Sequence, residues 1–379
     1  MFMNDKYTVS EINFTIAYMF FIISLFNRDV SNPNVFFVIT NTAKYISLVV
    51  LIATVISNSV INKQLYRILV LLGISLLITL QSGVMYFIIF VLLTYASRNI
   101  DNKFILKIAL FTIVTLTILT IFFCLLGIYT DEITCRWEGS AIRHSFGFYH
   151  SNVLPLIFLY STVYYCLIMP RKMNLYKLFF FVMIDFGLFF LCGSRNSLLL
   201  TALIVFVKYY VDRRKQRRVA NELVRKIIGI GARLSVFFWG AISLIIPLLL
   251  HRIPILNIVD YINSYRFSSI KAKLDVLGVS IFPKMTNDQY FKDLIVVDNG
   301  YAFIAIRYGL IVLLFLALLV YSLGKTYKNN TFVLCVIIIV SLANLIDNDI
   351  FDYCCLPFII IGLKSVVTNV RKYQVVGET

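Results

Sequence analysis

The sequence predicts an all-α, polytopic integral membrane protein that forms a single domain over residues 1–379. Hydrophobic residues make up 60% of the chain and charged residues only 14%, and the mean hydropathy is +0.86. A water-soluble domain does not have such a composition. Several apolar runs also extend over roughly 15 to 25 residues, the length that a helix needs to cross a bilayer.

The apolar runs predict about twelve transmembrane helices. The first run follows neither a basic segment nor a small-residue cleavage site, so we expect a retained first helix rather than a signal peptide. The expected spans cover residues 12–27, 35–57, 66–81, 84–97, 105–129, 152–169, 178–193, 196–211, 227–250, 300–322, 331–346 and 354–370.

The basic residues follow the predicted topology. The chain has 35 Lys and Arg against 19 Asp and Glu, and the cations collect in alternate loops, most densely in the loop 212–226 with its stretch DRRKQRR. By the positive-inside rule, these loops and both termini face the cytoplasm. The net charge of +16 therefore indicates topology, and nucleic acid is not an expected partner. The remaining loops, which carry mixed charge and all three histidines, are expected outside at 130–151, 193–196, 251–299 and 347–353.

The outer loop 130–151 ends in the stretch AIRHSFGFYHSN, which leads into the sixth span. Arg143 and His144 come first, and His150 and Asn152 stand where the helix is expected to begin. The positive end of a helix dipole disfavours imidazolium, so a neutral His150 could accept a proton. His150 is our first candidate for a general base and His144 the second. The alternative is that these residues only anchor the loop through hydrogen bonds.

A second polar stretch, CGSRNS, joins the seventh and eighth spans. The chain must reverse here at the outer surface, so Arg195 is expected to project there with Ser194 beside it. An arginine at this depth either binds a phosphate of a ligand or extends towards lipid phosphates.

The loop 251–299 is the only outer loop long enough to hold structure of its own. Apolar residues at helical spacing predict an amphipathic helix lying on the membrane, with Arg266 at its start. This helix is either part of a site or a structural lid without chemistry. The apolar residues are Phe267, Ile270, Leu274 and Leu277.

Three further observations concern polar residues near or within the spans. Asp298 and Asn299 precede the tenth span, where they either meet sugar hydroxyls or cap the helix. Asp185 and Arg307 lie within spans, and we expect them to pair between two helices because isolated charges are costly there. The sequence has no Cys or His cluster at ligand spacing, so no metal site is expected.

Four stretches in this order, on one expected face of the membrane, carry a resemblance. They are RHSFGFYHSN at the start of a span, GSRNS between two spans, NSYRFSS in the large outer loop and VDNGY before a span. Together they resemble the bacterial polysaccharide repeat-unit polymerases, the O-antigen and capsule polymerase (Wzy) family. Tyr265 and Pro283 depart from the family pattern, which commonly has glycine at both positions.

The resemblance implies a membrane glycosyltransferase in the bacterial plasma membrane, with its active site facing outside and no cofactor. Such enzymes transfer a growing glycan from undecaprenyl diphosphate to a sugar hydroxyl of another lipid-linked unit. The implied partners are the lipid-linked oligosaccharide, the bilayer and other capsule-assembly proteins such as a flippase and a chain-length regulator. The implied site has catalytic, diphosphate-binding and sugar-binding residues, which are His150, His144 and Asp298; Arg143, Arg195 and Arg266; and Asn152, Asn299 and Ser194.

Two alternatives remain open at the level of sequence. A ligase that attaches finished glycan to an acceptor would use much the same site. A flippase or transporter of lipid-linked sugars would also hold a diphosphate, but such proteins place their binding groups near the midplane of the membrane. The notable polar groups of this chain gather at the outer ends of the spans, which favours the polymerase.

Overall fold

The computed structural model describes residues 8–31, 37–57, 63–135, 142–169, 172–214, 222–250, 252–262, 265–284, 298–346 and 350–367. Within these ranges the chain is all-helical and has no strand, which confirms the predicted fold class. Two isolated β-bridges pair Val30 with Phe148 and Thr134 with Arg143. Parts of the predicted loops 130–151, 212–226 and 251–299 lie outside the described residues.

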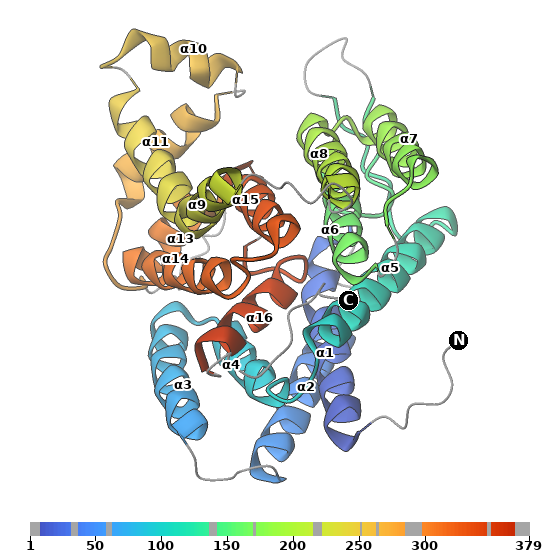
Figure 1. The fold of residues 1–379 in the computed structure, drawn as a ribbon, viewed down its shortest axis with the longest axis vertical. Helices are drawn as coiled ribbons and strands as arrows, with labels where there is room; N and C mark the ends of the chain where they lie inside the picture. Colours follow the sequence, from blue (N-terminus) through green and yellow to red (C-terminus); the bar gives the residue numbers. More distant parts are fainter. Residues whose placement is uncertain are drawn as a thin grey trace.

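The described helices follow one another along the chain (Figure 1). They are α1 (Val9–Phe26), η1 (Asn27–Asp29), α2 (Phe37–Ser57), α3 (Lys63–Ser82), α4 (Tyr86–Ala96), α5 (Asn102–Leu125), α6 (Val153–Ile168), α7 (Leu175–Cys192), α8 (Arg195–Arg214), α9 (Glu222–Leu249), α10 (Pro254–Ile262), α11 (Arg266–Leu277), α13 (Gly300–Arg307), α14 (Gly309–Thr326), α15 (Thr331–Ile346) and α16 (Leu356–Val367). The connections from α5 to α6 and from α11 to α13 are long.

Seven of these helices are long and apolar enough to cross a membrane: α1, α2, α3, α5, α7, α9 and α14. Many large apolar side chains on them point outward; Val49, Leu77 and Phe179, for example, are more than half exposed. Such surfaces suit contact with lipid, because a soluble protein rarely exposes apolar side chains over so wide an area. The apolar helices α4, α6, α15 and α16 are shorter, so the twelve-span count stays a prediction.

Helix α1 forms part of the centre of the bundle and supports the site described below. It begins at a capping box, in which the Thr8 hydroxyl accepts from the Glu11 N–H and the Glu11 carboxylate accepts from the Thr8 N–H. Phe14, Tyr18 and Phe21 are fully buried among α2, α4 and α5. This packing fixes the position of the turn that follows α1.

The predicted tenth span, 300–322, is interrupted. Helix α13 ends at Arg307, and α14 starts at Gly309, which has a φ of +81°. A Cβ atom at Gly309 would lie 2.6 Å from the Ile281 carbonyl oxygen, because the chain around Ile281 packs directly against this break. There the Leu310 N–H donates to the Ser280 carbonyl at 2.9 Å, and a segment of the large loop replaces the missing helical partner.

The predicted pair of Asp185 and Arg307 is wrong. Asp185 lies buried on α7, which packs mainly against α6 and α8, and no ion pair joins it to Arg307 within the described part of the chain. Arg307 lies at the break between α13 and α14, where its guanidinium stacks on aromatic rings. The two residues do not meet because α7 packs against α6 and α8, whereas α13 packs against α9, α14 and α15.

Candidate functional site

The loop before α6 is held to the end of α1 by backbone hydrogen bonds. The Ser31 N–H donates to the Gly147 carbonyl at 2.9 Å, and the Tyr149 N–H donates to the Asp29 carbonyl at 2.8 Å. The Thr130 N–H in turn donates to the Ser31 hydroxyl at 3.0 Å. Both sides of the loop are thus fixed to the turn that follows α1, which is a rigid support for side chains in it.

Asp131 and His144 form a short polar contact within this loop. The Asp131 Oδ2 lies 2.6 Å from the His144 Nδ1, and the Asp131 Oδ1 accepts from the N–H groups of Ser145 and Phe146, both at 2.8 Å. Partial burial alone would raise the pKa of Asp131, but hydrogen bonds from His144, Phe146 and Ser145 lower it below its ordinary value. Asp131 is therefore ionised near neutral pH.

This contact determines the tautomer of His144. An ionised carboxylate can only accept hydrogen bonds, so Nδ1 of His144 carries a proton, and in the neutral ring Nε2 has the lone pair. The side chain of His144 is 37% exposed, and its Nε2 has no hydrogen-bond partner among the residues that the structure describes. A histidine oriented by a carboxylate, with an accessible Nε2, is the arrangement of a general base.

His150 is less suited to the role that the sequence suggested. Its Nδ1 accepts a hydrogen bond from the Asn152 N–H at 3.1 Å, so in the neutral ring Nε2 carries the proton. In this tautomer His150 presents an N–H group and not a basic lone pair at Nε2. The structure therefore favours His144 over His150 as the base, the reverse of the order expected from the helix dipole.

Arg143 connects the loop to the turn between α7 and α8. It is buried, and its Nε donates to the Cys192 carbonyl at 2.7 Å while its Nη2 donates to the Asn152 side-chain oxygen at 2.5 Å. The carbonyl belongs to the last residue of α7, where the helix dipole favours a cation. Arg143 and Asn152 thus hydrogen-bond to each other, and Arg143 also bonds to the backbone. These contacts anchor the loop, as the alternative in the sequence analysis supposed, and are not contacts to a ligand.

The turn between α7 and α8 reverses the chain as expected. Gly193 ends α7 with a φ of +69°, and the Arg143 side chain packs so closely that a Cβ atom would lie 2.7 Å from its Nε. The Ser194 hydroxyl donates to the Ser197 hydroxyl at 3.1 Å and is buried. Arg195 is the first residue of α8 and is exposed, so of these predicted residues it is the one available to a ligand.

The predicted amphipathic helix is α11, but its apolar face does not lie on the membrane. Phe267, Ile270, Leu274 and Leu277 are buried in a cluster with residues of α9 and α13. Asp260 caps this helix, accepting from the Phe267 N–H at 2.7 Å. The helix therefore covers protein, as the structural alternative supposed, with Arg266 half-buried at its first position and Tyr265 before it in the left-handed conformation.

Asp298 and Asn299 come just before α13. The Asn299 side-chain oxygen accepts from the Ala302 N–H at 3.0 Å and the residue is 2% exposed, so it caps the helix and is not placed to hold a sugar. Asp298 is exposed and attracts Lys273 of α11. Burial lowers the pKa of Lys273, and the negative charge of Asp298 partly opposes this shift.

The predicted residues are therefore gathered in two groups. The first comprises Arg143, His144, His150, Asn152, Ser194 and Arg195, and it lies where α1, α6, α7 and α8 meet. The second comprises Arg266, Asp298 and Asn299, on α11 and α13, which appear on the other side of α16 in Figure 1. Asp131, which joins the first group through His144, was not among the residues predicted from the sequence.

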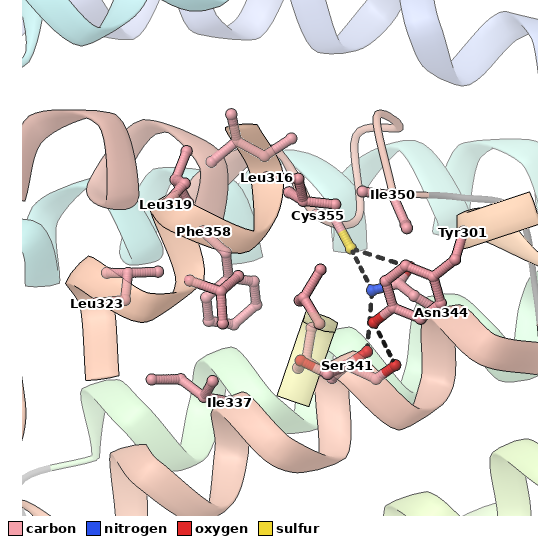
Figure 2. Close-up of a pocket in the computed structure, with 14 residues that line it drawn as sticks. Tyr301, Leu316, Leu319, Leu323, Ile337, Ser341, Asn344, Ile350, Cys355 and Phe358 are labelled. Carbon is pink, nitrogen blue, oxygen red and sulfur yellow. Dashed lines mark hydrogen bonds between the residues drawn. The ribbon is translucent and has the colours of Figure 1, made fainter. Parts of the chain in front are cut away.

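A cavity lies between α9, α13, α14, α15 and α16 (Figure 2). Its volume is about 50 Å³, and its walls are mostly apolar apart from Tyr301, Ser341, Asn344 and Cys355. These polar groups bond to protein; the Tyr301 hydroxyl, for example, donates to the Ser341 carbonyl at 2.7 Å. The cavity has room for a few water molecules and none of the predicted site residues lines it, so it is not a sugar site.

No match to a protein family, a curated protein or a solved structure emerges when this chain is compared with each of the three. The class that the fold defines is an all-α protein with several helices able to cross a membrane.

Proposed function

We propose that the chain is a polysaccharide repeat-unit polymerase of the bacterial plasma membrane. The substrate is a glycan carried on undecaprenyl diphosphate, and the reaction joins it to a sugar hydroxyl of a second lipid-linked unit. The observation that carries the proposal is the Asp131–His144 contact of 2.6 Å in a loop that is fixed to the ends of apolar helices. A base in this loop can take the proton of an acceptor hydroxyl whose lipid carrier is held in the bilayer.

His144 takes the proton of the acceptor hydroxyl at Nε2 while the hydroxyl oxygen attacks the anomeric carbon of the donor. The bond between that carbon and the diphosphate oxygen breaks, and lipid diphosphate leaves with the electron pair. Asp131 stabilises the imidazolium that forms, because its negative charge is held 2.6 Å from Nδ1.

Arg143 and Asn152 were expected to bind the diphosphate and a sugar. We assign both instead to positioning the loop, because their side chains hydrogen-bond to each other. Arg195 remains a candidate for the leaving diphosphate because it is exposed next to this loop. A planar guanidinium engages phosphate oxygens in pairs, which suits a leaving group with several negative charges.

The test uses purified full-length protein and synthetic undecaprenyl-diphosphate repeat units, with products separated as a glycan ladder on a gel. We expect a ladder from the wild type, single units from His144→Ala, and a smaller loss from His150→Ala. Equal folded yield of each variant is the control. A ladder that needs His150 and not His144 would contradict the assigned base.

The ladder assay, together with a transport assay in vesicles, separates the alternatives. A ligase would transfer preformed glycan to a different acceptor and give no ladder from single units. A flippase would move fluorescent lipid-linked units across a vesicle membrane without joining them. If wild-type protein that is folded gives no ladder with several repeat units, the polymerase proposal is wrong.

A further inference from the structure

Arg28, in the turn η1, was assigned no role by the sequence analysis. It is exposed, although the neighbouring aromatic residues Phe87 and Tyr308 are 9% and 5% exposed. Its guanidinium carbon lies 5.6 Å from the centre of the Tyr86 ring. Arg28 also interacts electrostatically with Tyr308, the residue between α13 and α14.

Arg307 approaches the same tyrosine from the end of α13. Its guanidinium carbon lies 5.4 Å from the centre of the Tyr308 ring and 5.6 Å from that of Phe303. Its Nε is buried and has no hydrogen-bond partner in the described part of the molecule. A buried N–H of a charged group without a partner is costly, so it indicates a missing acceptor.

Neither arginine has a carboxylate at ion-pair distance within the described ranges. The nearby acids are Asp29 and Asp352, which attract Arg28 over a longer distance. The Asp29 carboxyl is hydrogen-bonded to Tyr353 and to Asp352. The carboxyl groups of Asp29 and Asp352 therefore also interact with groups other than Arg28.

The two guanidinium groups therefore lie over aromatic rings without a carboxylate at ion-pair distance in the described part of the chain. Guanidinium groups pair with phosphate oxygens through parallel N–H bonds, and a diphosphate offers oxygens on two phosphorus centres. The turn that carries Arg28 is hydrogen-bonded to the His144 loop, since the Asp29 carbonyl accepts from the Tyr149 N–H at 2.8 Å.

We propose that Arg28 and Arg307 together bind the diphosphate of a polyprenyl-diphosphate-linked glycan. This assignment rests on the proposed function for the nature of the carrier lipid, and it adds two arginines that were not among the predicted site residues. Arg28 provides the accessible fork, and the Nε of Arg307 provides the donor that the protein leaves unused.

The test measures binding by full-length protein in nanodiscs, with polyprenyl diphosphate lacking any glycan and with inorganic pyrophosphate as separate probes. The variants are Arg28→Gln and Arg307→Gln. The matched control is Arg98→Gln, because Arg98 also stacks on a tyrosine, 4.0 Å from the centre of the Tyr95 ring, but lies in the turn between α4 and α5. We expect each test variant to weaken binding of the lipid by about tenfold or more and the control to leave it unchanged.

A second readout does not depend on the variants folding. Phenylglyoxal modifies accessible guanidinium groups, and mass spectrometry locates the products. Polyprenyl diphosphate should protect Arg28 of the wild type from modification and leave Arg98 as reactive as before. Unchanged lipid affinity in both folded variants, or no protection of Arg28, overturns the proposal.

The two probes separate the sources of the phosphate. Tight binding of the lipid, with pyrophosphate competing more weakly, supports a headgroup site. Equal binding of pyrophosphate without any binding of the lipid overturns the lipid assignment. A glycan ladder that is unaffected in both variants overturns this inference and leaves the polymerase standing, whereas lipid binding through Arg28 and Arg307 without a ladder rejects the polymerase and keeps the site.

Discussion

Replacing Asp131 by asparagine tests the proposed base with the least change in shape. The amide oxygen can still accept from the N–H groups of Ser145 and Phe146, which both bond to Oδ1 at 2.8 Å. The amide NH2 then replaces Oδ2, which lies 2.6 Å from the His144 Nδ1. Two N–H donors cannot face each other at this distance, so His144 must move its proton from Nδ1 to Nε2.

The expected loss follows from this change of tautomer. With Nε2 protonated, the ring no longer offers a lone pair to the acceptor hydroxyl. General base catalysis contributes about 10² to 10⁴ in rate, which corresponds to about 2.7 to 5.4 kcal/mol in the activation free energy. Because two backbone hydrogen bonds are retained, the free energy of unfolding should fall by only about 1 kcal/mol.

The assay is the initial rate of glycosidic bond formation, measured from the glycan ladder with saturating lipid-linked donor. Asp275→Asn is the control, because this substitution removes the same charge at an exposed position on α11, a helix that does not carry the His144 loop. It should keep the wild-type rate. If folded Asp131→Asn retains a third or more of the wild-type rate, His144 is not a base oriented by Asp131.

Three further predictions concern stability. The pKa of Asp131 is held below its ordinary value of 3.8, so its stabilising contribution is complete above that pH and is lost as the pH falls through the folded value; the difference in melting temperature between wild type and Asp131→Asn should therefore close in acid, and a constant difference would contradict this. Gly193→Ala should reduce the free energy of unfolding by about 1–2 kcal/mol through strain at positive φ, with a further loss from the clash with the buried Arg143 side chain, and so lower the melting temperature. Gly187→Ala should not lower it, because Gly187 lies in α7 with open space around it. Gly309→Ala should cost about 1–3 kcal/mol more than Gly127→Ala, because both have positive φ but only Gly309 has a carbonyl within 2.6 Å of its Cβ position; equal melting temperatures would refute the packing argument.

Parts of the candidate site could be predicted from the sequence. The stretch that carries Arg143, His144 and His150 was found because polar residues are conspicuous in a chain with 14% charged residues. Which histidine is oriented by a carboxylate could not be found in this way. That depends on Asp131, which is thirteen residues from His144 along the chain and meets it only because the loop folds back on itself.

Hydropathy and charge determined the all-α class and the apolar helices, because the bilayer requires long stretches in which backbone groups bond within the helix. Only the tertiary structure decided that α11 covers α9 and α13, that the tenth span breaks at Gly309, and that Arg28 and Arg307 approach the same tyrosine. Periodicity reports which face of a helix is apolar, but not whether lipid or protein covers that face. Contacts between distant segments depend on how the helices pack, and packing is a property of the folded chain.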